Sequence, residues 1–219
     1  MSLWTIVRGS LWELDGTRPP PRVTPRLPAR FTPLTPQDLP ALVAALGEPE
    51  TKILRERFAP ARQCFGAWID QNLAAYGWVS RQPEYIGEQE RTIKITPDDA
   101  YIWDCVTLPK YRGQHLYSAL LAHINHTLYQ SGVQHIWIGS DMNNKPSLRG
   151  FANAGFHPIL PMTYLRLFNL RVMWLGTQPN APSELITLAR RIFLEPDEHI
   201  IGPIAFRWSN PSTPTEVHP

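Results

Sequence analysis

The stretch VTLPKYRGQHLYSALL, residues 106–121, constrains the fold more than any other part of the chain. It reads as the end of a strand, a short loop with Arg112 and Gly113, and then an amphipathic helix. Leucine and isoleucine recur at four-residue steps after the loop, which is the spacing of one helix face. A glycine-bearing turn that opens a helix presents free backbone N–H groups and the positive end of the helix dipole. The stretch therefore predicts a site for a phosphate or a pyrophosphate.

The segments on either side of this turn predict an α/β fold. Residues 100–108 (AYIWDCVTL) are aromatic and apolar, as a central strand should be, and residues 133–138 (VQHIWI) predict the next strand. Pro146 suits the first turn of a short helix that ends at Gly155. The order strand, phosphate turn, helix, strand, short helix and strand implies a mixed α/β sheet with a helix on each face.

Further elements are expected before and after this core. A capped helix begins at Thr35, where a threonine precedes the apolar run LPALVAAL. Hydrophobic patterning and turn residues predict the other elements. These are strands at 63–69, 73–80, 84–95 and 200–208, strand-like runs within 163–175, and a helix at 182–194.

Proline divides the 219-residue chain, which contains 23 prolines. Residues 3–14 are apolar and predict one or two short strands. Residues 16–30 (GTRPPPRVTPRLPAR) cannot hold regular structure, because proline lacks the backbone donor and fixes φ. We therefore expect an N-terminal extension with a proline-rich connection over 1–30, one domain over 31–209 and a disordered tail over 210–219. A strand in the extension would be able to pair with the same strand of a second copy, so a homodimer is one expected assembly.

Composition excludes several classes of protein. The net charge is only +2 and the basic residues are scattered, which argues against nucleic acid as a partner. No apolar stretch reaches the roughly 20 residues that a membrane span needs, and the first residues lack the pattern of a signal peptide. Two cysteines, Cys64 and Cys105, do not make a disulfide framework, so we expect a cytoplasmic protein.

The segment from Val106 to Phe156 resembles the GNAT superfamily of acyl-CoA-dependent N-acetyltransferases. In that family a strand is followed by a Gln/Arg-x-x-Gly-x-Gly/Ala turn that wraps the pyrophosphate of coenzyme A. Residues 110–115 (KYRGQH) fit this turn with a lysine first and His115 in place of the usual small residue. The second family signature is an asparagine after the next strand and a short helix that ends in Gly-Phe. Asn144 and residues 155–156 have this spacing, and two signatures are more specific than one glycine-rich loop.

The resemblance implies that the chain binds acetyl-CoA as a co-substrate and acetylates an amine. Gly113 leaves room for the pyrophosphate, and Arg112 and Lys110 add positive charge. A strand amide near Val106 would hold the thioester oxygen. The residues expected to bind the cofactor are Val106, Thr107, Lys110, Arg112, Gly113, Gln114, His115, Leu116, Tyr117, Asn144 and Phe151. Asn144 suits a helix cap equally well, and His115 either points to solvent or donates to a phosphate oxygen.

Catalytic residues are less clear from the sequence. Many family members carry a tyrosine four residues before the Gly-Phe glycine, as the acid for the leaving sulfur, but this chain has Phe151 there. For the base we expect Asp104, an acidic residue in an apolar strand, although pairing with an arginine explains it equally well. Weaker candidates for the base are Glu84, Glu88 and Tyr101.

Two further interpretations follow from the same residues. His123 and His126 lack a second pair of ligands, so no metal site is expected. A non-catalytic or weakly catalytic acyl-CoA sensor of the same fold is the alternative to an N-acetyltransferase, and the acceptor, a small molecule or a protein, is not encoded in any motif.

Overall fold

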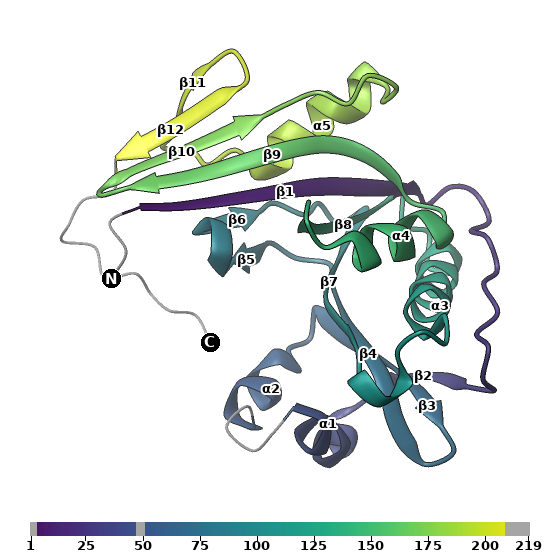
Figure 1. The fold of residues 1–219 in the computed structure, drawn as a ribbon. Helices are drawn as coiled ribbons and strands as arrows, with labels where there is room; N and C mark the ends of the chain where they lie inside the picture. Colours follow the sequence, from purple (N-terminus) through teal and green to yellow (C-terminus); the bar gives the residue numbers. More distant parts are fainter. Residues whose placement is uncertain (1–3, 47–50, 209–219) are drawn as a thin grey trace.

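The computed structural model describes residues 4–46 and 51–208, which form a mixed α/β structure built on one large sheet (Figure 1). In the described residues this sheet has ten strands, β1 Trp4–Asp15, β2 Arg30–Leu34, β3 Arg62–Ile69, β4 Asn72–Ser80, β7 Asp99–Thr107, β8 His135–Asp141, β9 His157–Leu167, β10 Leu170–Leu175, β11 His199–Ile201 and β12 Ile204–Trp208. The α-helices are α1 Leu39–Leu46, α2 Thr51–Arg57, α3 Leu116–Gln130, α4 Lys145–Asn153 and α5 Ser183–Phe193. The expected fold class is confirmed.

Neighbouring strands of the sheet are antiparallel except for β7 and β8, which run parallel. The strand order is β11-β12-β10-β9-β1-β8-β7-β4-β3-β2. A parallel pair needs a crossover connection, and α3 supplies it here. The predicted phosphate turn lies between the end of β7 and the start of α3, next to the middle of the sheet.

The N-terminal segment is a strand inside the sheet, which corrects the expected extension. β1 pairs with β8 along one edge and with β9 along the other, and its Leu11 and Leu14 are buried. A strand that is paired on both edges belongs to the core of the fold. The expected proline-rich connection does follow it, since residues 16–29 contain no helix or strand, and the expected tail lies outside the described residues.

The helices cover both faces of the sheet. Leu116, Leu120 and Ile124 of α3 pack with α4 residues against one face of the middle strands. On the other face, α1 and α2 pack against Tyr76 and Trp78 of β4. The helix α5 packs on that second face further along the sheet, against strands β1, β8 and β9.

Local sequence signals explain where several elements begin. Thr35 caps a short 3₁₀ helix, Pro36–Asp38, which leads into α1. Its backbone N–H donates to Asp38 Oδ2 at 2.8 Å and its Oγ1 accepts from the Gln37 N–H at 3.3 Å. Just after the last residue of α3, Gly132 has a left-handed conformation, with a φ of 78°, which ends the helix.

Two segments that we expected as single strands are hairpins. Residues 84–95 form β5 Glu84–Ile86, a 3₁₀ helix Gly87–Gln89 and β6 Arg91–Ile93, and β5 and β6 pair outside the large sheet. Residues 200–208 turn at Gly202, which has a φ of 58°, so that β11 pairs with β12.

The hairpin of β5 and β6 is fastened to the chain after α5 by a buried ion pair. Arg91 Nη2 lies 2.8 Å from Glu198 Oε1, and both side chains are inaccessible to solvent. Arg91 Nη1 also donates to the Phe193 carbonyl oxygen at 2.6 Å. A buried ion pair of this kind favours one arrangement, because breaking it would leave a charge unpaired in the core.

A bulge in β7 opens the middle of the sheet. Asp104 has a φ of 42°, and the register against β4 shifts so that Tyr76 faces Val106 while Trp78 faces Trp103. The glycine between those β4 residues lies close to Cys105, since a Cβ on Gly77 would lie 2.6 Å from Cys105 Sγ and the thiol would have to move. On the other side, β7 pairs with β8 only as far as Ile102, so the two parallel strands separate beyond the bulge.

Candidate active site

A cavity of about 710 Å³ lies at the helix-opening turn. Its walls come from the end of β7, the turn, the first residues of α3 and the start of α4. They are Cys105, Val106, Thr107, Tyr111, Arg112, Gly113, His115, Leu116, Tyr117, Asn144, Pro146, Ser147 and Arg149. We call this space the cofactor-side cavity, after the residues expected to bind a cofactor that line it.

The turn has the backbone shape that an anion site needs. Gly113 and His115 both have left-handed conformations, with φ of 77° and 58°, immediately before the first residue of α3. Alternation of this kind points successive N–H groups toward one concavity. A Cβ built on Gly113 meets no atom within 4 Å, so the space in front of it is open. His115 is exposed, and histidine is one of the few larger residues enriched in this conformation.

The proline-rich connection braces this turn from outside. The Arg26 backbone N–H donates to the Gln114 carbonyl oxygen at 2.9 Å, and Arg26 Nη1 donates to the Gly113 carbonyl oxygen at 3.3 Å. A Cβ on Gly155 would lie 2.7 Å from Pro21, so the connection also packs closely against the end of α4. Sequence reasoning missed this role, because the contacts join residues almost ninety positions apart.

Most of the predicted cofactor residues lie together around this cavity. They are Val106, Thr107, Arg112, Gly113, His115, Leu116, Tyr117 and Asn144. Lys110 and Gln114 belong to the turn but do not line the cavity, and the ammonium of Lys110 lies 5.3 Å from the ring centroid of Tyr111. Asn144 also caps α4, since its Oδ1 accepts from the Ser147 N–H at 3.3 Å.

Phe151 is placed in the core, outside the cavity. It is 1% exposed and packs against Trp12, Phe156 and Tyr117. Its ring stacks on Tyr117 with 6.3 Å between the centroids, and Tyr117 is the aromatic side chain that reaches the cavity.

Tyr117 is positioned by the small residue beside Phe151. A Cβ on Gly150 would lie 2.3 Å from Tyr117 Cδ1, so only glycine allows this close approach. Burial raises the pKa of Tyr117, with a smaller contribution from Cys105, while a hydrogen bond with Ser147 opposes the shift. The Tyr117 hydroxyl therefore keeps its proton at neutral pH and is a donor in the wall of the cavity.

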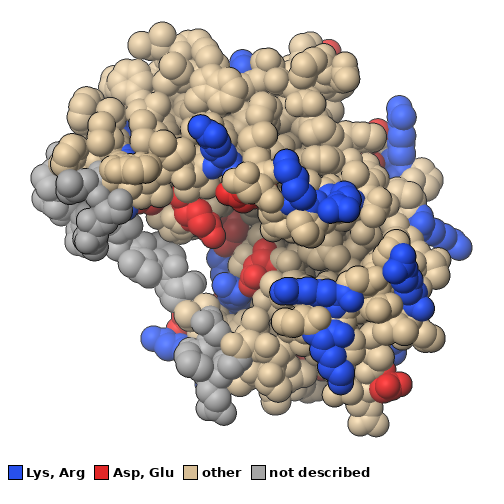
Figure 2. All heavy atoms as spheres, in the orientation of Figure 1, with Lys and Arg blue, Asp and Glu red and all other residues tan. Residues whose placement is uncertain are grey.

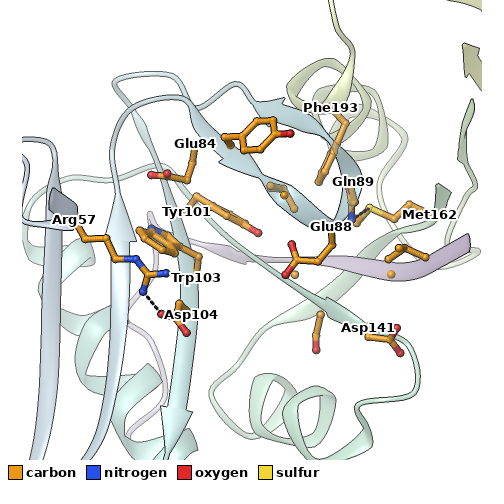
Figure 3. Close-up of a pocket in the computed structure, with 17 residues that line it drawn as sticks. Arg57, Glu84, Glu88, Gln89, Tyr101, Trp103, Asp104, Asp141, Met162 and Phe193 are labelled. Carbon is orange, nitrogen blue, oxygen red and sulfur yellow. Dashed lines mark hydrogen bonds and ion pairs between the residues drawn. The ribbon is translucent and has the colours of Figure 1, made fainter. Parts of the chain in front are cut away.

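A second cavity, of about 950 Å³, opens on the opposite side of the β7 bulge. We call it the acceptor-side cavity, because Asp104, the residue expected as the base for the acceptor, lines it. Figure 2 shows acidic side chains gathered in a hollow between the part of the molecule that contains β5 and β6 and the part that contains α2. Its lining residues come from eight elements (Figure 3), and they are Val7, Gly9, Arg57, Glu84, Tyr85, Ile86, Gly87, Glu88, Gln89, Tyr101, Trp103, Asp104, Gly139, Ser140, Asp141, Met162 and Phe193.

Asp104 is held by an arginine in this cavity. Arg57 Nη1 donates to Asp104 Oδ2 at 2.5 Å, and the Tyr76 hydroxyl donates to Asp104 Oδ1 at 3.4 Å (Figure 3 shows the first contact). The arginine partner that the sequence left open is therefore present. Of the weaker candidates, Glu84, Glu88 and Tyr101 line the same cavity, although residues 84–88 and 101–104 lie on different elements.

The two cavities meet at consecutive residues of β7. Trp103 and Asp104 line the acceptor-side cavity, while Cys105, Val106 and Thr107 line the cofactor-side cavity. The end of β8 and the loop after it also contribute to both cavities. Asp141 lines the acceptor-side cavity and Asn144 lines the cofactor-side cavity. β7 and β8 are no longer paired at this point, and adjacent residues of β7 line the two cavities.

The described residues show neither a metal site nor a membrane span. No group of three or more histidine, cysteine, aspartate or glutamate side chains is arranged to hold an ion in residues 4–46 and 51–208. Over the same ranges, every helix is too short or too polar to cross a bilayer.

A separated pair of parallel strands beside a helix-opening turn defines the class of fold that the sequence predicted. The family model of GNAT acetyltransferases matches residues 31–156, more than half of the chain. The chain therefore belongs to the GNAT acetyltransferase family. No curated protein matches it.

Solved structures align with this chain at low sequence identity. A Drosophila protein aligns with a TM-score of 0.53 and 14% identity over 75% of this chain and 52% of its own. A tandem GNAT protein from the clavulanic acid biosynthesis pathway aligns with a TM-score of 0.50 and 20% identity over 78% of this chain and 54% of its own. The ribosomal-protein-S18-alanine N-acetyltransferase from Escherichia coli aligns with a TM-score of 0.46 and 20% identity over 59% and 78%.

Proposed function

We propose that this chain is an N-acetyltransferase that transfers the acetyl group of acetyl-CoA to an amine of an acceptor molecule. The observation that carries the proposal is the meeting of two cavities at the β7 bulge. One cavity has the backbone turn of an anion site, and the other is lined by carboxylates that suit an amine. A transfer reaction needs such an arrangement, because both reacting groups must be held within a few ångströms of each other.

The cofactor-side cavity fits the co-substrate that the family uses. The N–H groups at the start of α3 and the guanidinium of Arg112 suit a pyrophosphate, and the open space in front of Gly113 lets it approach the backbone. Asn144 and the unpaired edge of β7 at Val106 suit the amide groups of the pantetheine arm. When bound, acetyl-CoA supplies an activated acetyl thioester.

The residues at the bulge account for the movement of charge and protons. The amine nitrogen attacks the thioester carbonyl carbon, and an N–H group of the bulge near Val106 is available to stabilise the negative charge on the oxygen. The proton leaves the amine for Asp104, whose Oδ1 is the oxygen not engaged by Arg57. The C–S bond then breaks. The Tyr117 hydroxyl, on the cofactor side, donates a proton to the sulfur, because position 151 holds a phenylalanine where many family members have a tyrosine.

An acyl-CoA sensor without turnover is the second candidate. Two observations favour it, namely the buried phenylalanine at position 151 and the ion pair that engages Asp104. In a sensor, the coenzyme would bind but no amine would accelerate release of the thiol.

The proposal is tested by calorimetry with coenzyme A and by a thiol-release assay with acetyl-CoA and a panel of amines. We expect saturable binding of coenzyme A and amine-dependent release of one thiol for each acetylated product. Binding without release across the panel would favour the sensor, and absence of binding by well-folded protein would reject both.

We also propose a homodimer as the assembled state. The outer strands expose large apolar side chains that a monomer rarely presents together, among them Trp174 at 42% exposure and its ladder partner Ile204 at 39%. Sedimentation of the wild type and of Trp174→Glu tests this, since we expect a dimer that the substitution converts to a monomer.

A further inference from the structure

The acceptor-side cavity contains two carboxylates, Glu88 and Asp141, that form no ion pair within residues 4–46 and 51–208. Glu84 is engaged by Arg62 at 2.6 and 3.0 Å, and Asp104 is engaged by Arg57. By contrast, Glu88 makes no ion pair or hydrogen bond with another described residue. Asp141 uses Oδ1 to accept from the Asn143 N–H at 2.6 Å, and its other carboxylate oxygen has no partner among the described residues.

The arginines near this cavity are turned away or engaged. Arg8 lies between Val7 and Gly9 on β1, and both neighbours line the cavity, so Arg8 faces the opposite side of the sheet. Arg166 and Arg171 are held by Glu90 at 3.0 and 2.5 Å. The charges of Glu88 and Asp141 therefore act on whatever enters the cavity.

The Tyr101 side chain lines this space, and its hydroxyl is open to it. Tyr101 is 7% exposed, its hydroxyl makes no hydrogen bond with a described residue, and it lies over Gly139, 3.7 Å from where a Cβ would stand. In Figure 3 the hydroxyl points toward Glu88. Burial raises the pKa of Tyr101, and the charges of Glu88 and Glu84 add to the shift. The hydroxyl is therefore available as a hydrogen-bond partner for a ligand in the cavity.

Gln89 supplies a buried polar atom without a partner, and buried polar groups normally have one, so this atom indicates a ligand. Gln89 lines the cavity, is 8% exposed, and its Oε1 has no hydrogen-bond partner among the described residues. Its Nε2 lies 3.5 Å from Met162 Sδ, which is a weak contact at best. An amide oxygen and a phenol oxygen beside two carboxylates form a set of hydrogen-bond acceptors, which suits a group that only donates.

The walls between these polar groups are apolar. Val7, Ile86, Met162 and Phe193 line the cavity, and Trp103 stands beside the Arg57–Asp104 pair (Figure 3). Such walls suit the methylene stem of an aliphatic amine. In Figure 3 Glu88 lies between Asp104, at the bulge, and Asp141, at the other end of the view.

We infer that the acceptor is a small aliphatic diamine or polyamine. One of its amines lies at the β7 bulge, where it is acetylated, and a second ammonium group is held by Glu88 and Asp141 with the oxygens of Tyr101 and Gln89. This inference rests on the proposed function and names the acceptor class of the same site. An acceptor with one amine would leave Glu88 and Asp141 unsatisfied, and an acceptor with a carboxylate at its far end would be repelled by them.

Three amines of equal chain length test the inference in the thiol-release assay, namely hexylamine, 1,6-diaminohexane and 6-aminohexanoate. We expect kcat/KM for the diamine to exceed that for hexylamine by about tenfold or more, with the aminohexanoate lowest. Glu88→Gln should bring the ratio of diamine to hexylamine close to one. Glu184→Gln, an equal loss of charge on the exposed first turn of α5, should leave the ratio as in the wild type.

Calorimetry with the same amines separates this inference from the proposed function. If no amine is acetylated, the proposed function fails, and tighter binding of the diamine than of hexylamine, lost in Glu88→Gln, still upholds recognition of a second cation. Equal binding and equal turnover of the two amines by the wild type would overturn the inference. A preference for the diamine that Glu88→Gln leaves intact would also overturn it.

Discussion

The two cavities that meet at the β7 bulge are built in opposite ways. The cofactor-side cavity is formed mainly by consecutive residues, from Cys105 to Tyr117, and its main features are backbone features. The acceptor-side cavity is formed by side chains from eight elements, and its main feature is a set of charges. A backbone turn leaves a pattern in the sequence, whereas a cavity assembled from distant side chains does not. The turn of the first cavity was therefore visible before the structure. For the second, the sequence offered Asp104, Glu84, Glu88 and Tyr101 only as separate candidates and did not show the cavity that they share.

The largest expected effect separates the two cavities at Gly113. In Gly113→Glu, a side chain and a negative charge enter the phosphate turn, so we expect affinity for coenzyme A to fall by roughly 100-fold or more. Affinity for 1,6-diaminohexane should stay close to that of the wild type. Both constants are measured by calorimetry.

A matched control exists at the other end of the same helix. Gly132 has nearly the same φ, 78° against 77°, and a Cβ there also meets no atom within 4 Å. Gly132→Glu therefore carries the same backbone strain and the same charge away from both cavities. Equal affinity for coenzyme A in folded Gly113→Glu and in Gly132→Glu would show that the turn does not hold the pyrophosphate.

The next effect is expected on the acceptor side, at Asp104. Asp104→Asn removes the carboxylate assigned to the amine's proton, so kcat should fall by roughly 100-fold while affinity for coenzyme A changes little. Asp98→Asn, in the exposed turn before β7, is the control for a general effect of the substitution. Steady-state kinetics over a range of pH measure kcat for both variants. A kcat of Asp104→Asn equal to that of the wild type would contradict the assignment of Asp104 as the base.

A smaller effect is expected from Tyr117, on the cofactor side. Tyr117→Phe keeps the ring that stacks on Phe151 and removes only the hydroxyl, so kcat should fall by about tenfold, because water partly replaces the donor. Tyr129→Phe, near the end of α3, serves as the control. A full rate in Tyr117→Phe would show that this hydroxyl supplies no proton.

The smallest effect lies outside both cavities, at His135. A hydrogen bond with Glu13 raises the pKa of His135, although burial opposes the shift, and Nδ1 lies 3.0 Å from Glu13 Oε1. The protonated form therefore stabilises the fold below pH of about 6.5, the ordinary value for histidine, and this contribution is lost as the pH rises through the higher folded pKa.

Denaturant unfolding at pH 6 and pH 8 measures this contribution of His135 to the free energy of unfolding. The free energy of unfolding should fall more between the two pH values in the wild type than in His135→Gln, by less than about 1 kcal/mol. The pH profile of turnover should be the same in both proteins. A changed pH profile of turnover in His135→Gln would show that His135 affects the site as well as the stability of the fold.

Sequence reasoning found the strongest local signals of the fold. The turn at Gly113, the strand before it, the capped start at Thr35 and the short helix after Asn144 all depend on neighbouring residues, and the structure has each of them. The central place of β1 was missed, because its partners β8 and β9 follow more than a hundred residues later. The hairpin of β5 and β6 was missed for the same reason, since it is fastened through Arg91 and Glu198.

The residues of the site also fall into those that local sequence predicts and those that only the folded chain brings together. The turn residues were expected near the cofactor, and eight of the expected residues do line one cavity. Tyr117, the donor that we propose in place of a tyrosine at position 151, comes from another helix, and no local pattern relates it to Gly150. Glu88 and Asp141 belong to different segments, so only the folded chain shows that both line the acceptor-side cavity.

The most direct test of the account is the affinity of a single molecule that joins both ligands, coenzyme A linked through an acetyl bridge to 1,6-diaminohexane. If the cavities are continuous at the β7 bulge, calorimetry should show this conjugate binding at least about 100-fold more tightly than coenzyme A, because the second interaction becomes intramolecular. Affinity no greater than that of coenzyme A alone would contradict the account.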